Sequence, residues 1–232
     1  MKKKLALILA GTAMAAMVLA GCGEKNNASG EDVKTAESVE DKKTFTVGFD
    51  AEYPPYGYMD ENGEYTGFDL ELAEAVCKLE GWELVKKPLN WDSKDMELNS
   101  GSIDCIWNGF TMNGREEDYT FSTPYVDNSQ VIVVAEKSGI DTLEDLAGKT
   151  VGVQAASAAL DLLQSEEEGG QKKLADTFGA LNEFADYNTA FTELQAGALD
   201  ALAIDVGVAN YQIKSRGEGY KILDETLNTE QY

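Results

Sequence analysis

Apolar and polar positions alternate along the chain in two different ways after residue 43. The runs 46–49, 82–86 and 103–107 are short and apolar, as in strands of a buried sheet. Between the first two runs, apolar residues recur at helical spacing, with charged residues on the opposite face. The apolar face consists of Leu72, Ala73, Val76 and Leu79, and the polar face of Glu71, Glu74 and Lys78. This alternation predicts an α/β fold whose open sheets have mostly parallel strands and right-handed crossovers.

The strand and helix pattern occurs twice. Residues 46–50 (TVGFD) recur as 150–154 (TVGVQ), and residues 98–104 (LNSGSID) recur as 194–200 (LQAGALD). In the second pair, a helix is expected to end at glycine and to pass directly into an apolar strand. The repeat therefore predicts two α/β lobes of about 90 residues each, which is within ordinary domain sizes.

The apolar segment 131–135 (VIVVA) lies between the two copies and is predicted to cross from one lobe to the other. The expected organisation is lobe one over residues 44–130 and lobe two, with the hinge strand, over residues 131–232. Ligands of open α/β sheets bind at the carboxyl ends of the strands, so a cleft between the lobes would gather four such ends. These ends are Asp50 and Gly109 in lobe one, and Gln154 and Asp205 in lobe two.

The first 43 residues have a different pattern. Three lysines, at positions 2–4, precede an apolar stretch over residues 5–19 and the small residues before Cys22. This pattern is typical of a secretory signal peptide, here residues 1–21. A membrane-spanning helix starts in the same way but needs about 20 apolar residues, more than this run contains. Residues 22–43 are polar and rich in charge, which predicts a flexible tether.

Charge and composition exclude several function classes. The chain has 19 basic and 42 acidic residues and a net charge of −23, so nucleic acid is not expected as a partner. It contains no histidine, the commonest catalytic base and metal ligand, and no metal or cofactor is expected. Cys77 and Cys105 lack the close spacing of a metal or redox motif. Secretion permits a disulfide between them, but two buried free thiols are the favoured interpretation.

Several spaced motifs resemble the polar amino-acid-binding proteins of bacterial ABC importers, and the likeness runs from Thr44 to the end. The motifs are residues 47–56 (VGFDAEYPPY), 67–73 (GFDLELA), 109–111 (GFT), Arg115, 121–125 (FSTPY), 146–153 (LAGKTVGV) and 201–205 (ALAID). The resemblance implies a two-lobed, periplasmic-binding-protein-like fold of type II. Its lobes are expected to close around a free, polar amino acid and to catalyse nothing.

The same resemblance implies where the protein works and with what. Leu19-Ala20-Gly21-Cys22 resembles a bacterial lipobox, in which Cys22 is lipidated and becomes the first residue of the mature protein. The family's anchor carries at least two acyl chains, which suits durable attachment to the outer face of the cytoplasmic membrane. The expected partners are an amino-acid ligand and the permease of an ABC transporter, and the protein is expected to be a monomer.

An amino acid presents a carboxylate and an ammonium group on one carbon, so its receptor needs donors for the first and acceptors for the second. By resemblance, Arg115 pairs with the carboxylate, and Thr111 is the accompanying donor. Asp205 pairs with the ammonium group, opposite the carbonyl of Gly109. Other roles are open from the residues themselves: a surface ion pair for Arg115, an ordinary strand position for Thr111 and a helix N-cap for Asp205. Thr111 and Arg115 are one residue closer than is usual in the family, so this loop should differ locally.

The remaining site candidates come from both lobes. Ser157 opens a helical pattern, where it would either help to receive an anion or act as an N-cap. The family more often carries glycine where Ala156 stands. The aromatic candidates for the walls of the site are Tyr53, Tyr56 and Trp91, although aromatic residues are more often core than pocket. Asp50 or Glu52 would contact the polar end of the ligand side chain, with Gln154 and Asn108 as further polar lining.

Two alternatives of other classes stay open. An enzyme of the same fold, similar to cyclohexadienyl dehydratases or lytic transglycosylases, is not excluded by fold. The chain has no Gly-x-Ser-x-Gly motif, and residues 148–150 lack the earlier glycine of a phosphate loop, since Leu143 stands there. A ligand-sensing receptor domain is the second alternative, although such a receptor would need a spanning helix. Which amino acid is bound cannot be read from the sequence, because a few side chains at the far end of the pocket decide it.

Family members continue past Tyr232 with a strand that returns through the hinge to lobe one and with a terminal helical stretch. Neither is expected in this chain. Lobe one should therefore have an exposed apolar face, and the 232-residue form should bind weakly or fold poorly.

Overall fold

The computed structural model describes residues 44–217 and 219–232. The predicted signal peptide, Cys22 and the tether lie outside the described residues. No helix within the described ranges has the length and apolar character needed to cross a membrane.

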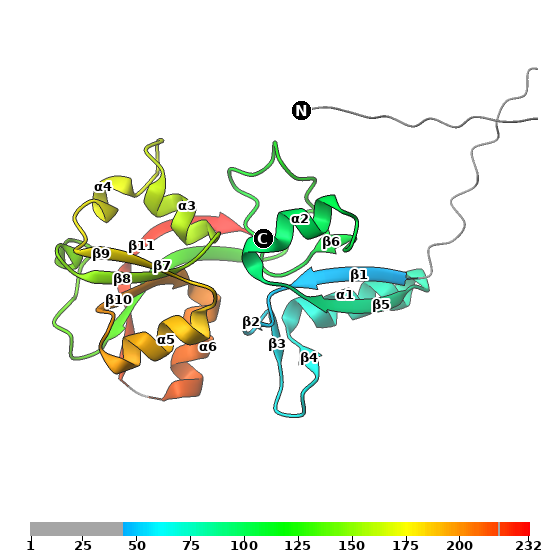
Figure 1. The fold of residues 1–232 in the computed structure, drawn as a ribbon, viewed down its shortest axis with the longest axis horizontal. Coiled ribbons are helices and arrows are strands. Elements are labelled where there is room, and N and C mark those ends of the chain that lie inside the picture. The colour runs from blue at the N-terminus through cyan, green and yellow to red at the C-terminus, as the bar shows by residue number, and fades with distance from the viewer. Residues whose placement is uncertain (1–43, 218) are drawn as a thin grey trace, which may run out of the picture. The chain divides into compact units, whose positions relative to one another are not determined.

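Lobe one is built on a small parallel sheet in the order β5-β1-β6, with helix α1 packed against it (Figure 1). Its strands are β1 (Thr44–Phe49), β5 (Glu83–Pro88) and β6 (Cys105–Ile106), and its helices are α1 (Phe68–Glu80), η1 (Trp91–Ser93) and α2 (Lys94–Asn99). A separate antiparallel sheet follows β1 and consists of β2 (Glu52–Tyr53), β3 (Gly57–Met59) and β4 (Tyr65–Thr66). The strands and the helix predicted for this region are confirmed, with ends shifted by a few residues. The predicted apolar face of the helix is correct only in part, because Ala73 is buried together with Leu70 and Cys77, whereas Leu79 is 85% exposed.

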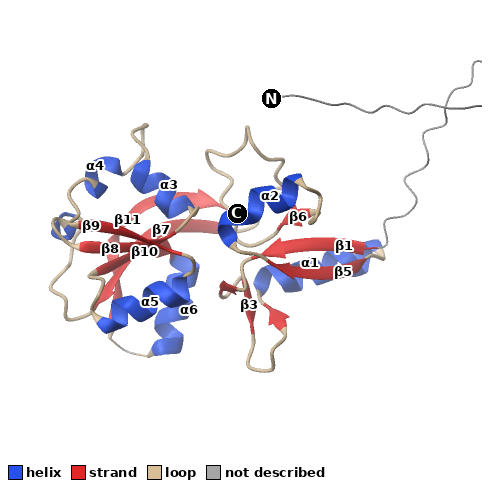
Figure 2. Ribbon diagram, viewed as in Figure 1, coloured by secondary structure: helices blue, strands red, loops and turns tan. Residues whose placement is uncertain are grey.

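Lobe two contains a five-stranded sheet in the order β11-β7-β10-β8-β9 with helices on both faces (Figure 2). The strands are β7 (Asp127–Ala135), β8 (Thr150–Gln154), β9 (Ala180–Phe184), β10 (Ala201–Asp205) and β11 (Tyr220–Gln231). The helices are η2 (Glu144–Leu146), α3 (Ala158–Gln164), α4 (Lys172–Ala175), α5 (Tyr187–Ala196) and α6 (Val206–Arg216). Strands β8, β9 and β10 are parallel, while β7 is antiparallel to both of its neighbours.

The sequence repeat corresponds to a repeated set of contacts. In lobe one, the Asp104 carboxylate accepts a hydrogen bond of 2.8 Å from the N–H of Thr46, and in lobe two Asp200 does the same for Thr150. A Cβ atom on Gly48 would lie 2.5 Å from the side chain of Ile103, and one on Gly152 would lie 2.5 Å from Leu199. Each glycine therefore lets its strand, β1 or β8, approach the residue that precedes the repeated aspartate.

The expected absence of a strand that follows Tyr232 and returns to lobe one stays untested, but the described residues end in a strand that was not predicted from the sequence. Strand β11 pairs with β7 in antiparallel register from Tyr220 to Gln231, and the two strands lie side by side in Figure 1. The next residue, Tyr232, exchanges backbone hydrogen bonds with Tyr125 and Val126 and packs its ring against Tyr56 of lobe one. The sequence Leu223–Tyr232 is mostly polar, so the strand is recognisable by its pairing partner rather than by an apolar pattern. The terminal helical stretch remains untested.

The two cysteines of the described residues form no disulfide, in agreement with the favoured interpretation of two thiols. Cys77 is buried on α1, whereas Cys105 on β6 is half-buried, so the expectation of complete burial holds for one of them. Exposed apolar side chains are unevenly distributed between the lobes. The large apolar side chains that stay exposed all belong to lobe one: Met59, Phe68, Leu79, Trp82, Val85 and Met96.

Candidate functional site

Four strand ends meet between the lobes, as the repeat predicts. Asp50 follows β1 and Gly109 follows β6, while Gln154 and Asp205 are the last residues of β8 and β10. The amide nitrogen Nε2 of Gln154 donates a hydrogen bond of 2.7 Å to the carboxylate of Asp50. The equivalent strands β1 and β8 are thus joined through their end residues, one from each lobe.

A small cavity lies at this junction. Its volume of about 10 Å³ is close to the space that one water molecule needs. Ten residues line it: Tyr53, Trp91, Gly109, Phe110, Thr111 and Arg115 from lobe one, and Gln154, Ser157, Ala158 and Asp205 from lobe two. Eight of these ten are among the eleven residues predicted from the sequence. The lobes are therefore closed onto each other around the predicted groups.

The other three predicted residues lie beside the cavity without lining it. Asp50 is 5% exposed, and the side-chain oxygen of Asn108 accepts a hydrogen bond from its N–H. Burial is the largest cause that raises the pKa of Asp50, to about 6. Tyr56 packs against Tyr53 with ring centroids 5.7 Å apart and belongs to the apolar core beneath the cleft. Tyr56 therefore supports the site from behind rather than forming a wall of the cavity.

Arg115 lines the cavity and also forms an ion pair across the cleft. One of its terminal nitrogens lies 2.7 Å from the carboxylate of Asp161 on α3. Its guanidinium carbon lies 4.7 Å from the ring centroid of Phe110. The side chain of Arg115 is 15% exposed, against 63% for Asp161, and a partly exposed pair of this kind contributes about 1 kcal/mol or less. Because its partner is solvated, Arg115 can exchange Asp161 for another carboxylate at little cost.

The alternatives for the two helix-start residues are resolved in opposite ways. Ser157 is an N-cap, because its hydroxyl accepts a hydrogen bond of 3.2 Å from the N–H of Leu160 at the start of α3. Asp205 precedes α6, but its side chain makes no capping bond. It accepts instead from the Tyr232 hydroxyl at 2.6 Å and from the side-chain amide of Gln130 at 2.5 Å. The Asp205 carboxylate is therefore directed into the hinge and the cavity.

Thr111 is not an ordinary strand residue, because the described structure places it in the loop after β6. Its hydroxyl donates a hydrogen bond of 2.8 Å to Glu230 near the end of β11. The side chain is 5% exposed and lines the cavity. The hydroxyl that is expected to face the ligand therefore donates its hydrogen bond to a carboxylate of β11.

Sequence reasoning missed Lys94 at the start of α2. This lysine is 5% exposed, lies with its ammonium nitrogen 5.1 Å from the centroid of the Trp91 ring and donates to the carbonyl oxygen of Ala156 across the cleft at 3.2 Å. Burial is the largest cause that lowers its pKa. Ala156 has a positive φ of 53°, which explains why glycine is the more usual residue there. Lys94 and Arg115 together make one side of the cleft positive.

Sequence reasoning also missed a polar group behind Asp205. It consists of Asn128 and Gln130 on β7, Glu230 on β11 and Tyr232, all 4% exposed or less. A signal existed for two of them, since Asn128 and Gln130 are polar and lie two positions apart, on one face of a strand that continues directly into the buried apolar run 131–134. The others depend on the pairing of β11 with β7, which the sequence did not reveal.

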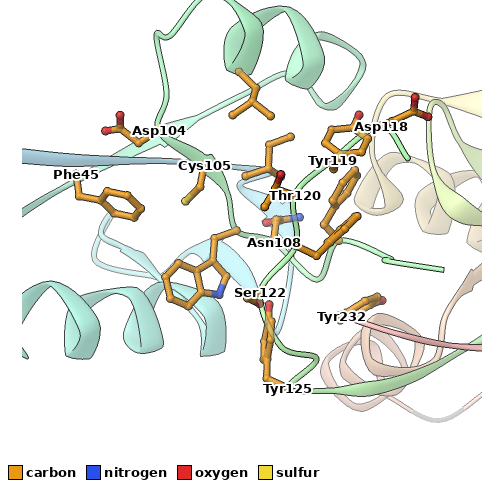
Figure 3. A pocket seen from close by; sticks show the side chains of 15 residues that line it. Phe45, Asp104, Cys105, Asn108, Asp118, Tyr119, Thr120, Ser122, Tyr125 and Tyr232 are labelled. Atoms are coloured by element: carbon orange, nitrogen blue, oxygen red, sulfur yellow. The ribbon is translucent and has the colours of Figure 1, made fainter. Parts of the chain in front are cut away.

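A much larger cavity lies elsewhere, beside β6 of lobe one. This β6 groove has a volume of about 500 Å³, and Figure 3 shows Phe45 and Tyr232 on opposite sides of it. Its apolar lining is Phe45, Leu98, Ile106, Trp107, Phe110 and Phe121. None of the four strand-end residues lines the groove, so it is distinct from the cleft site. Asn108, which precedes Gly109, is among the residues that line it. Within the described ranges, no group of acidic or cysteine side chains could hold a metal ion.

Comparison with known proteins agrees with this geometry. The family described as bacterial extracellular solute-binding proteins, family 3, matches residues 45–225. The arginine-binding extracellular protein ArtP of Bacillus subtilis is 33% identical over 97% of this chain and 82% of its own length. The L-cystine-binding protein TcyJ of Escherichia coli is 29% identical over 94% of this chain and 79% of its own length. A histidine-bound ABC uptake transporter substrate-binding protein from Streptococcus pneumoniae superposes with a TM-score of 0.76 and 36% identity, covering 82% of this chain and 78% of that one.

Proposed function

Since the chain belongs to the bacterial extracellular solute-binding proteins of family 3, we propose that it is the amino-acid receptor of an ABC importer. The observation that carries this proposal is the pairing of opposite charges across the cavity between the lobes. Arg115 lines one side and Asp205 the other, with Gly109 beside them. A free amino acid carries a carboxylate and an ammonium group on one carbon, so it offers a partner to each of these two side chains.

In this proposal, the ligand carboxylate replaces Asp161 as the partner of Arg115. The exchange is favourable because a guanidinium group binds a carboxylate through two parallel hydrogen bonds when the geometry allows. Lys94, 5.1 Å from the Trp91 ring centroid, adds positive charge to the same side. The ligand ammonium then lies between the carboxylate of Asp205 and the carbonyl of Gly109.

The far end of the site favours a ligand with a basic side chain. Asp50 is buried there, Glu52 is adjacent, and the charges of Glu52 and Asp186 both raise the pKa of Asp50. An acidic end of this kind is stabilised by a ligand cation, which would lower the pKa of Asp50 again. Tyr53 and Trp91 would contact the apolar part of the ligand side chain. Arginine, the ligand named for ArtP, is therefore our first candidate, with histidine and cystine next.

Binding would be coupled to closure. The bonds between Gln154 and Asp50, Lys94 and Ala156, and Arg115 and Asp161 all join lobe one to lobe two. A ligand that bridges Arg115 and Asp205 adds to these contacts only when the lobes are together, so it shifts the population toward the closed form. The permease would recognise that form, while Cys22 would anchor the monomeric protein to the outer face of the membrane.

The test is a thermal-shift screen across the free amino acids, followed by calorimetric titration of the best ligand. Arg115→Ala and Asp205→Asn should each weaken binding by about thirtyfold or more, because removing one partner of a buried charged contact costs about 2–5 kcal/mol. Lys137→Ala, at an exposed position, is the matched control and should bind normally. Undiminished affinity in both site variants would overturn the proposal, and so would turnover of prephenate or cell-wall fragments, which would favour an enzyme.

A further inference from the structure

Two buried carboxyl groups share the same hydrogen-bond donors in the hinge. The Nδ2 atom of Asn128 lies 2.8 Å from an oxygen of Asp205 and 2.8 Å from an oxygen of Glu230. The Nε2 atom of Gln130 lies 2.5 Å and 2.8 Å from the same two oxygens. Asp205 and Glu230 are each 4% exposed. The two carboxyl groups are therefore close neighbours in a region with little water.

The group has more acceptors than donors. The side-chain oxygens of Asn128 and Gln130 are buried and have no hydrogen-bond partner among the described residues. In the part of the chain that the structure describes, no lysine or arginine forms an ion pair with Asp205 or Glu230. Two buried negative charges without a cation are costly, because burial and like charge both disfavour ionisation. The group therefore lacks a positive charge, a proton or both.

Arg115 lines the same small cavity as Asp205, but its ion pair is with Asp161 of α3. The other ionisable neighbours cannot supply that charge. They are the four tyrosines Tyr53, Tyr56, Tyr187 and Tyr232, from β2, the following turn, α5 and the chain end. Burial raises the pKa of each, so all four stay neutral. Burial is also the first cause that raises the pKa of Asp205, and the charge of Glu230 is the second.

We propose that Glu230 is a positioning residue of the amino-acid site: it holds one proton jointly with Asp205 until the ligand ammonium displaces that proton. The proposal rests on the proposed function for its ligand. With its proton, the carboxyl pair carries one negative charge. Without the proton it carries two negative charges, and the ammonium group of the ligand offsets one of them. The net charge of the buried group is thus the same before and after binding, which avoids an unpaired charge in either form.

The structure offers a route for the released proton. Glu230 and Asn128 line a polar cavity of about 470 Å³ at the hinge, whereas Asp205 lines the cleft cavity. The O–H bond of the carboxyl pair breaks, and the proton passes to water in this cavity while the ammonium enters from the cleft. Thr111 links the pair to lobe one through its hydrogen bond to Glu230. Protonation of the carboxyl pair and closure of the lobes are therefore connected through Glu230 on β11.

The experiment is calorimetric titration with L-arginine in phosphate and in Tris, whose ionisation enthalpies differ. Near neutral pH the wild type should release up to about one proton per ligand bound, and its affinity should rise up to about tenfold per pH unit. Glu230→Gln keeps an acceptor for Thr111 but removes the charge, so its proton release should fall by at least half and its pH dependence should flatten. Glu183→Gln, an exposed residue with the same substitution, should behave as the wild type.

A purely structural role of Glu230 would weaken binding equally at every pH without changing the proton count. Equal proton release by the wild type and Glu230→Gln would overturn the proposal. Infrared difference spectra of the unliganded protein test the pair without any ligand. The wild type should show a protonated buried carboxyl band at neutral pH that Glu230→Gln and Asp205→Asn both lose. If L-arginine fails to bind, this measurement still decides the inference, and absence of the band would overturn it.

Discussion

The two lobes repeat one motif but bury very different amounts of apolar surface. Lobe two packs both faces of a five-stranded sheet, with one apolar cluster around Phe191 and Ile204 and another around Ile132 and Leu163. Lobe one has two three-stranded sheets and one small cluster. The fully buried members of that cluster are Val47, Phe49, Leu70 and Ala73.

The difference assigns different tasks to the lobes. Lobe two, which is well packed, contributes the start of helix α3 and Asp205 to the site. Lobe one contributes Arg115 from a long loop after β6, beside the β6 groove and the exposed apolar side chains. A lobe with few buried apolar contacts opens locally at lower free energy than its partner. We therefore expect lobe one to be the more mobile half of the receptor, and the predictions below test this contrast.

The largest effect should come from removing one fully buried aromatic ring in each lobe. Phe191→Ala and Phe49→Ala should each cost about 3–5 kcal/mol, the usual range for a phenylalanine in a core. Phe191→Ala should destabilise the whole protein, whereas Phe49→Ala should unfold lobe one and leave lobe two protected. Hydrogen exchange resolved by segment is the measurement. Equal loss of protection in β8 and β1 after Phe49→Ala would contradict the contrast between the lobes.

The pattern of buried strands was predictable because its information is local. The repeated segments placed Asp50, Gln154, Gly109 and Asp205 at strand ends, and the structure brings them together. The repeated segments adopt matching structures partly because of their glycines. Gly48, for example, is needed for the close approach of the first strand of lobe one. Eight of the cavity-lining residues followed from these ends and from the family resemblance.

What could not be predicted depends on contacts between distant segments. Glu230 lies 102 positions from Asn128 and joins it only because β11 pairs with β7. The sequence of β11 has little apolar character, so its place in the sheet is set by that pairing. Lys94 carries no signal either, since a lysine beside Trp91 is equally compatible with an exposed helix start. The roles of Arg115 and Asp205 toward a ligand stay predictions.

A second difference between the lobes is sensitivity to pH. Asp69 on α1 is fully buried in lobe one, and burial is the largest cause that raises its pKa from 3.8 to about 7. Hydrogen bonds from Tyr125 and from the N–H of Gly109 offset part of this rise. A raised folded-state pKa means that the stabilising contribution is complete below pH 3.8 and is lost as the pH rises through about 7.

Asp69→Asn removes this ionisation and should flatten the curve of stability against pH. Relative to the variant, the unfolding free energy of the wild type should fall with rising pH, by at most about 1.4 kcal/mol per pH unit. Urea unfolding at a series of pH values between 4 and 7 measures the difference. Asp224→Asn, at an exposed carboxyl of lobe two, is the control. Parallel curves for the wild type and Asp69→Asn would show that Asp69 ionises normally.

The smallest effect compares the repeated glycines, because both lobes then receive the same change. A Cβ atom at Gly48 would lie 2.5 Å from Ile103 and 2.8 Å from Leu89, and one at Gly152 would lie 2.5 Å from Leu199. Overpacking of this kind costs about 1–3 kcal/mol. We expect Gly152→Ala to cost more than Gly48→Ala in urea unfolding, because the looser core of lobe one can shift to accommodate the methyl group. Shortening the opposing side chain, with Ile103→Val in lobe one or Leu199→Val in lobe two, should recover part of each loss. A larger cost in lobe one would mean that its few buried contacts are the more rigid ones, and the assignment of mobility would have to be reversed.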